Sequence, residues 1–241
     1  FAGQNYPSWW TTFRGLLHNL DTLAGSLGVY DALTLQRAGQ VDLPGSGPDE
    51  IVRDPSRDLF HVALGGLETH PDYGRTPLNL SIFRSQLVTY DFARGEVTPL
   101  GVWPGTEGVS LRHLAVDAGG RIIVGGQLAD PRRGTAERVL WLCDSHGAAH
   151  LDDGRRLSGY VSSVACHGQD ALISSKESNT VLRLVDGALV EDRRLDGASA
   201  VAMGPGITAA SGYGTLHLGD AAIPVSDGFE FDNHGLAGLL A

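Results

Sequence analysis

The sequence predicts an all-β fold, a β-propeller built of four-stranded antiparallel blades, and three observations support this prediction. Short runs rich in Val, Ile, Leu, Thr and Tyr alternate with turn residues along most of the chain, as is typical of β-strands. Glycine is frequent, at 33 of 241 residues, and glycine pairs separate many of these runs. A unit of strand, turn, strand, loop, strand and turn recurs at a spacing of about 40 to 55 residues, which indicates propeller blades.

The individual strands are expected at apolar runs bounded by turn signals. The clearest runs are LGVYDAL, LFHVALGG, QLVTYDF, RIIVGGQL, RVLWLCD, ALISSK, TVLRLVDG and GTLHLG. The segments Asp91–Gly95 and Asp186-Gly187 have the composition of outer hairpin turns, where glycine takes a positive φ. Each blade would then be one antiparallel sheet, which buries its faces by packing against its neighbours.

Four copies of the repeat are clear, beginning at GPDEIV, LRHLAV, VSSVAC and ASAVAM. The fragment SLGVYDALTLQRAGQVDL represents a fifth, so about five blades are visible. We expect residues 1–241 to form a single β-propeller domain, with N-terminal blades missing or irregular over residues 1–21. The most helix-like segment is SWWTTFRGLLHNLDTLAG, residues 8–25, where the apolar residues partly fit a spacing of three and four.

Composition and charge argue against binding to nucleic acid and against insertion into a membrane. The chain has 18 Lys and Arg residues against 28 Asp and Glu residues, a formal charge of −10, and shows no basic stripe. Because nucleic-acid binding needs clustered Lys and Arg, we expect no nucleic-acid partner. No run approaches 18 consecutive apolar residues, so we expect no membrane insertion. Cys143 and Cys166 each lie in an apolar run, where the sequence allows two buried thiols or a disulfide.

Polar residues at the entries of the innermost strands are the first candidates for a binding site, because these entries face the central channel of a propeller. His113 begins one such strand in SLRHLAVD, and Asp49 and Glu50 begin another. Tyr160 and Ser162 begin a third, in GYVSSVA. We therefore expect side chains from distant parts of the sequence to meet at one mouth of the channel.

The segment Gly65–Leu80 is too long for a hairpin loop and is rich in polar residues, so we expect it to fold over the same mouth. A second polar segment, Asp232-Asn233-His234, follows the last apolar run and could close the ring of blades. The predicted binding residues at the mouth and in this lid are Glu68, His70, Asp72, Arg75, Asn79, Arg112, His113, Tyr160, Asp232, Asn233 and His234.

Imidazoles combined with carboxylates suit iron, zinc or manganese, so the sharpest hypothesis is a metal site formed by His113, His234 and Glu50. Each group also has a structural interpretation. His70 would shape its own loop, Arg112 with His113 would hydrogen-bond one blade to the next, and the loop would only close a gap between blades. No HExxH, CxxC, EF-hand or GxSxG motif occurs in the sequence.

The segments GGLETHPDYGRTPLNL, SLRHLAVDAGGRIIVGGQ, GYVSSVA and FDNH, in this order and spacing, resemble the bacterial exported proteins grouped as domain-of-unknown-function family 1513. The resemblance covers roughly residues 22–236. It implies a seven-bladed propeller of the WD40 or YVTN type, exported to the periplasm by the twin-arginine route. Members are often encoded beside imelysin-like and iron-transport proteins. The chain departs from the family at Gly47-Pro48-Asp49-Glu50, where members have Gly-Pro-His-Glu, and in its N-terminal part.

The function expected from this resemblance is a periplasmic binding or accessory protein, not an enzyme, in an iron-related uptake system. It would dock an imelysin-like or other iron-uptake protein, or hold a metal or chelate, with iron or another divalent metal as its cofactor. Two alternatives stay open at this point. One is a metal-dependent enzyme of the lactonase-like or quinoprotein-like propeller type, and the other is an interaction scaffold without a small ligand.

Overall fold

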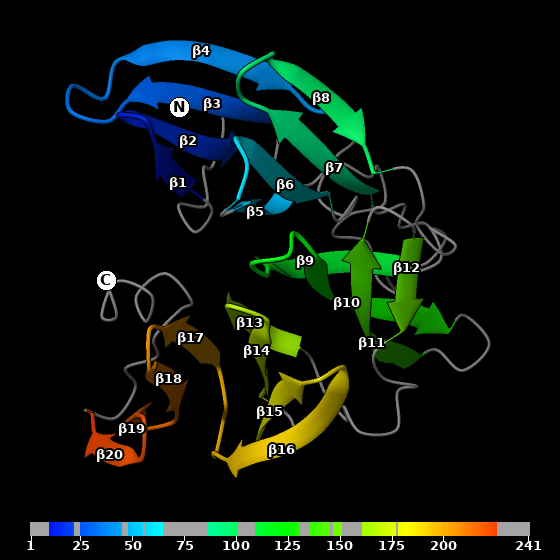
Figure 1. The fold of residues 1–241 in the computed structure, drawn as a ribbon, viewed down its shortest axis with the longest axis vertical. Helices are drawn as coiled ribbons and strands as arrows, with labels where there is room; N and C mark the ends of the chain where they lie inside the picture. Colours follow the sequence, from blue (N-terminus) through cyan, green and yellow to red (C-terminus); the bar gives the residue numbers. More distant parts are fainter. Residues whose placement is uncertain are drawn as a thin grey trace. The chain divides into compact units, whose positions relative to one another are not determined.

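The structure, a computed structural model, describes residues 10–21, 25–44, 48–54, 56–64, 86–100, 109–130, 135–144, 147–150, 161–176 and 178–225. These residues form 20 β-strands in five four-stranded sheets (Figure 1), which confirms the all-β class and the four-stranded antiparallel blades. None of the described residues belongs to a helix that could cross a membrane. The chain divides into two compact units, Phe1–Arg112 with Gln127–Glu137 and His113–Gly126 with Arg138–Ala241, and each is described by itself.

Every sheet is a meander in which strands adjacent in the sequence are neighbours in the sheet. The first two sheets consist of β1 (Trp10–Phe13), β2 (Leu16–Asp21), β3 (Ser26–Asp31) and β4 (Arg37–Asp42), then β5 (Pro48–Arg53), β6 (Leu59–Leu64), β7 (Gln86–Asp91) and β8 (Glu96–Pro99). The third sheet consists of β9 (Val109–Val116), β10 (Ile122–Asp130), β11 (Thr135–Asp144) and β12 (Gly147–His150). The last two consist of β13 (Val161–His167), β14 (Asp170–Ser175), β15 (Thr180–Val185) and β16 (Ala188–Arg194), then β17 (Ala200–Gly204), β18 (Ile207–Gly212), β19 (Thr215–Leu218) and β20 (Ala221–Pro224).

All eight apolar runs singled out in the sequence form strands, namely β3, β6, β7, β10, β11, β14, β15 and β19. The predicted outer turns are also present. Gly95 closes the β7–β8 turn at φ 70°, and Asp186 and Gly187 form the β15–β16 turn at φ 50° and 78°. In the β7–β8 turn the Asp91 carboxylate accepts the backbone N–H groups of Ala93 and Arg94 at 2.9 and 3.1 Å. The Asp91 side chain thus provides a hydrogen-bond acceptor for two turn N–H groups that have no partner in the strand ladder.

The helix-like spacing over residues 8–25 gives no helix in the described residues 10–21, which form the antiparallel hairpin of β1 and β2. Arg14 and Gly15 make its two-residue turn with φ 51° and 73°, and Phe13 pairs with Leu16. Two consecutive positive φ values characterise the hairpin turn that matches strand twist, and they end any helix. β2 also pairs with β3, so the fifth blade is a complete four-stranded sheet.

The core of unit 1 is an aromatic cluster between its two sheets. The Phe60 ring is fully buried, and it lies 5.7 Å from the Phe13 ring and 6.1 Å from the Tyr90 ring, measured between centroids. Phe92 meets Phe13 edge-on at 5.3 Å. Residues from β1, β6, β7 and the β7–β8 turn therefore pack as one apolar layer, and the offset and edge-to-face arrangements add to the burial energy.

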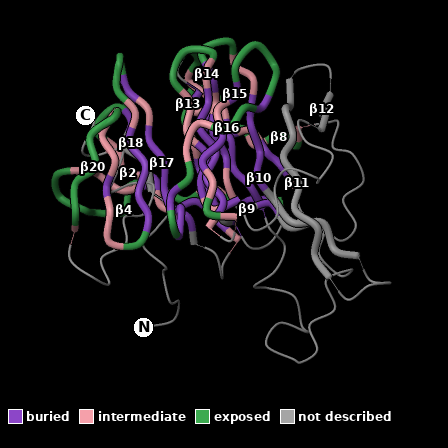
Figure 2. Tube along the Cα trace, turned by 90° about the horizontal axis from the view of Figure 1, so that it is seen from below, coloured by how far each residue is buried: buried purple, intermediate pink, exposed green. Residues whose placement is uncertain are grey.

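In unit 2 the apolar side chains of neighbouring sheets form the core, for example Ile173, Leu182 and Val164. Figure 2 shows buried residues along the strands and exposed residues at the turns. Cys166 is a free, partly buried cysteine packed against this core, so it does not form the disulfide that the sequence allowed. Burial raises the pKa of the Cys166 thiol to about 12, which makes it an unreactive apolar side chain.

Candidate functional site

Most of the residues predicted for the channel mouth lie outside the described residues, and so does the segment Gly65–Leu80. Those residues are Glu68, His70, Asp72, Arg75, Asn79, Tyr160, Asp232, Asn233 and His234. Of the other predicted residues, the structure describes Glu50, His113 and the strand position of Arg112 in β9.

Glu50 is the third residue of β5, as expected for a strand entry, and its exposed fraction is 4%. His113 is half-buried in the middle of β9 and not at its start, because the strand already begins at Val109. Glu50 belongs to unit 1 and His113 to unit 2. Within the described part of the chain, no group of three or more His, Cys, Asp and Glu residues could hold a metal ion.

A histidine–carboxylate pair occurs instead at His61 and Asp54 in unit 1, where the sequence analysis expected no site. Both side chains are buried, with exposed fractions of 2% and 0%. The His61 Nε2 lies 3.8 Å from the Asp54 Oδ2, and the His61 Nδ1 lies 3.1 Å from the Thr89 Oγ1. Asp54 accepts the Ser56 N–H at 2.8 Å and the Arg57 Nε–H at 2.8 Å. The pair connects the turn after β5 to strands β6 and β7.

The ionisation of this pair agrees with a structural role. Burial lowers the pKa of His61 from 6.5 to about 4, although the nearby Asp54 carboxylate acts in the opposite direction. Burial raises the pKa of Asp54, but hydrogen bonds from Ser56 and Arg57 outweigh this effect and leave that pKa lowered. At neutral pH a neutral imidazole therefore lies beside an ionised carboxylate. The pair lies within one blade, so it differs from the blade-to-blade hydrogen bond that the sequence analysis considered for Arg112 and His113.

The best candidate for a functional site is a group of residues on turns and strand ends of unit 2, which we call the rim site. It consists of Ser162, Lys176, Asn179, Gly197 and Tyr213. Lys176 and Asn179 belong to the β14–β15 connection, Gly197 to the link between β16 and β17, and Tyr213 to the β18–β19 turn. Three connections of two adjacent blades thus bring residues 37 positions apart into contact, as the Lys176–Tyr213 pair shows.

Tyr213 is exposed but tightly positioned. Its exposed fraction is 53%, and its backbone N–H donates to the Asp196 carbonyl at 2.9 Å. The ring lies so close to Gly197 that a Cβ on this glycine would be 2.4 Å from a ring carbon. Gly197 has φ 61° and donates its N–H to the Asn179 Oδ1 at 2.8 Å. The absence of a side chain at Gly197 is therefore what allows the tyrosine ring to lie flat against the backbone.

Lys176 adds a positive charge to this aromatic surface. Its Nζ lies 5.0 Å from the centroid of the Tyr213 ring, within the range of a cation–π contact. Its backbone N–H donates to the Ser162 Oγ at 2.9 Å, which connects it to the start of β13. Lys176 is the only lysine among the 18 Lys and Arg residues of the chain. An ammonium is a compact, strongly hydrated charge, unlike the planar guanidinium used elsewhere in this sequence.

A seam of buried hydroxyls fixes the two blades that carry the rim site. The Ser163 Oγ accepts the Val201 N–H at 3.1 Å, across the contact between β13 and β17. The Ser174 Oγ donates to the Ser199 carbonyl at 3.3 Å, and the Ser199 and Ser211 hydroxyls lie 3.0 Å apart. Because these groups satisfy one another in the interior, they hold the adjacent blades in one register.

Sequence reasoning identified only part of this site. It selected Tyr160 and Ser162 as a strand entry, and β13 does begin at Val161. It expected a strand at GTLHLG, directly after Tyr213, which is confirmed by β19. Two signals could have indicated more, namely the single lysine and a tyrosine between two glycines at a turn.

Over residues 17–237 the sequence matches the family described as "Protein of unknown function (DUF1513)". The chain belongs to this family. The resemblance found from four segments is thereby confirmed, over nearly the same range. A search of curated proteins finds no match to this DUF1513 protein.

Several solved structures are similar to this DUF1513 protein in fold. Hydrazine synthase of Kuenenia stuttgartiensis superposes with a TM-score of 0.65 at 15% identity, covering 88% of this chain and 69% of that one. A nidogen/laminin complex gives a TM-score of 0.56 at 9% identity, covering 91% and 76%. A complex of KlAtg21 with the coiled coil of AgAtg16 gives 0.55 at 12%, covering 85% and 63%. At such low identity the likeness shows the fold alone, and it confirms the β-propeller class.

Proposed function

We propose that this DUF1513 protein is a binding propeller without catalytic function, which docks a partner protein through the rim site. The observation that carries this proposal is Tyr213, a large aromatic side chain that is 53% exposed yet held by Gly197 and by a backbone hydrogen bond. Exposed aromatic residues that are already fixed in one conformation lose little entropy on binding. Tyrosine is also among the residues that contribute most at protein interfaces.

The rim site combines several kinds of recognition. The Tyr213 ring offers an apolar face, and Lys176 places an ammonium over it at 5.0 Å. The seam from Ser163 to Val201 keeps both blades in register, so the ring and the ammonium stay in one geometry. A partner with an apolar side chain next to an acidic one would complement this surface.

The identity of the partner and the compartment are further parts of the proposal, supported by the family resemblance. Members of the family are typically exported, and they are often encoded beside imelysin-like and iron-transport proteins. We therefore propose a periplasmic accessory role in iron uptake, with an imelysin-like or other iron-uptake protein as the docked partner. Holding a metal or a chelate through His113, His234 and Glu50 stays a separate prediction.

The decisive test measures the affinity of the purified chain for the imelysin-like protein encoded in the same genome, by biolayer interferometry. We expect Tyr213→Ala to weaken binding by about 30-fold, the equivalent of about 2 kcal/mol lost at an interface hot spot. Leu33→Ala is the matched control, because Leu33 is a 94% exposed apolar residue in unit 1 and should leave affinity unchanged.

A second variant, Lys176→Met, separates charge from packing at the same site. It removes the ammonium but keeps an unbranched apolar side chain over the ring, so we expect a smaller loss that depends on salt concentration. Equal affinity of the wild-type protein and Tyr213→Ala would refute docking through the rim site. No binding by the wild-type protein would refute the imelysin-like protein as the partner.

A further inference from the structure

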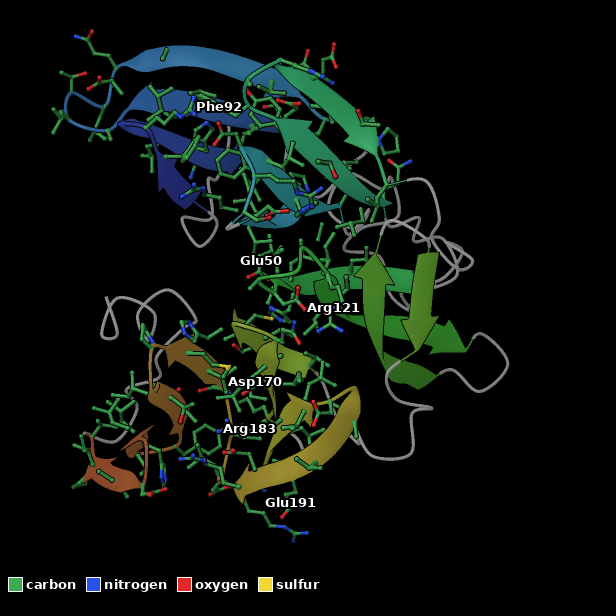
Figure 3. All side chains as sticks on the ribbon, viewed as in Figure 1. Glu50, Phe92, Arg121, Asp170, Arg183 and Glu191 are labelled. Atoms are coloured by element: carbon green, nitrogen blue, oxygen red, sulfur yellow. The ribbon has the colours of Figure 1, made fainter. Side chains whose placement is uncertain are left out.

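Two arginine side chains of unit 1 lie over the same aromatic ring. The Arg53 Cζ is 4.2 Å from the centroid of Phe13, and the Arg14 Cζ is 5.1 Å from that centroid. Arg14 also lies 5.9 Å from the centroid of Phe92, which Figure 3 labels among the side chains of unit 1. The Phe92 ring meets the Phe13 ring edge-on. The aromatic faces thus position both guanidinium groups at the border of the aromatic core.

The two distances to the Phe13 centroid set an upper limit on the separation of the two guanidinium groups. Since both lie near one centroid, their Cζ atoms are less than about 10 Å apart. An oxyanion held by an N–H···O bond of about 2.8 Å has its central atom about 4 Å from a guanidinium carbon. One tetrahedral anion can therefore contact both groups when their Cζ atoms are about 8 Å apart or less, and the limit set by the ring admits such separations.

Arg53 is the group best suited to receive such an anion. It is the last residue of β5 and is exposed, and among the residues that the structure describes it forms no ion pair. The nearest carboxylate in the sequence, that of Asp54, is fully buried and accepts hydrogen bonds from Ser56 and Arg57. The Phe13 ring holds the Arg53 guanidinium in place without neutralising its charge.

Arg14 is held in an unusual conformation. It has φ 51°, a left-handed conformation that is uncommon for residues other than glycine. The Asp58 Oδ2 accepts one N–H of Arg14 at 2.5 Å, which orients the guanidinium and leaves its other donors for a second acceptor. The backbone is fixed as well, because the Gly15 carbonyl accepts the N–H of Ala32 at 2.9 Å.

We propose that Arg14 and Arg53, arranged around Phe13, form a binding site for a phosphate group. Two guanidinium groups supply more N–H donors than a carboxylate can accept, whereas a phosphate offers three terminal oxygens and a double charge. A chain with a formal charge of −10 repels anions in general, so an anion site requires such a local concentration of positive charge. The ligand is either a soluble phosphate or the phosphate of a lipid headgroup.

The first experiment titrates the full chain with sodium phosphate by calorimetry at low ionic strength, with sodium chloride of matched ionic strength as the blank. We expect saturable binding that weakens about tenfold or more in Arg53→Gln and in Arg14→Gln. Arg37→Gln is the matched control, because Arg37 is an exposed arginine of the same unit, in β4, and pairs with Gln40. Arg53→Lys keeps the charge but loses the planar donors, so it should also bind more weakly than the wild type.

The second experiment distinguishes the two sources of phosphate, by co-sedimentation of the chain with neutral vesicles that contain or lack phosphatidic acid. Binding only to soluble phosphate assigns a small ligand, and binding to the phosphatidic acid vesicles, lost in Arg53→Gln, assigns a headgroup. The proposal is overturned if neither probe binds with a dissociation constant below about 10 mM. It is also overturned if Arg37→Gln reduces binding as much as Arg53→Gln does.

Discussion

Replacing Gly197 by alanine tests whether the close contact with Tyr213 shapes the rim site. Gly197 has φ 61°, and an added Cβ would lie 2.4 to 2.7 Å from three atoms of the Tyr213 ring. The left-handed backbone alone costs an alanine about 1 kcal/mol. Overpacking costs about 1 to 3 kcal/mol more, and the lower end applies because an added Cβ can displace the half-exposed ring toward solvent. We expect Gly197→Ala to lower the free energy of unfolding by about 2 kcal/mol.

The chain provides a matched control for this substitution. Gly206, in the β17–β18 turn of the same unit, has φ 69°, and an added Cβ would meet no atom within 4 Å. Gly206→Ala should therefore lose only the backbone term of about 1 kcal/mol. The difference of about 1 kcal/mol between the two variants, about 2 to 4 °C in Tm, reports the ring contact.

Urea denaturation followed by circular dichroism measures both variants, and a double variant completes the cycle. In a Tyr213→Ala background the ring is gone, so Gly197→Ala should cost no more than Gly206→Ala. The reasoning is refuted if Gly197→Ala is as mild as Gly206→Ala in the wild-type background. It is refuted equally if the extra loss persists without the tyrosine.

Three further predictions follow from buried groups. Ser163→Ala leaves the buried Val201 N–H without its acceptor and should cost about 1 to 3 kcal/mol in urea denaturation, whereas Ser178→Ala, in a partly exposed turn, should cost little. The pKa of His61 is lowered to about 4, so between pH 6.5 and pH 4 the unfolded chain binds more protons than the folded chain. The free energy of unfolding should therefore decrease as the pH is lowered from 6.5 to 4. An NMR titration that shows a His61 pKa above 6 would contradict this. The Cys166 thiol, with its pKa raised to about 12, should react with iodoacetamide at pH 8 far more slowly in the folded than in the unfolded chain, as measured by peptide mass spectrometry.

The sequence by itself was sufficient for the most apolar strands and for the outer turns. All eight apolar runs are strands, and the aspartates and glycines of the outer turns lie where the pattern predicted them. These features depend on residues close together in the chain, through side-chain alternation and local φ values. Dependence on local pattern also explains why residues 8–25 were misleading. Their spacing of apolar residues is ambiguous between helix and strand, and the pairing of β2 with β3 decided the structure.

The candidate sites depended on the tertiary structure. Lys176 meets Tyr213, and Arg53 meets Phe13, across the boundary between one sheet and the next. His61 and Asp54 pair inside a single blade, but only the burial of both shows that they are structural. Spacing along the chain does not record which side chains of neighbouring blades touch, because that depends on how the sheets pack and where a glycine such as Gly197 allows a close approach.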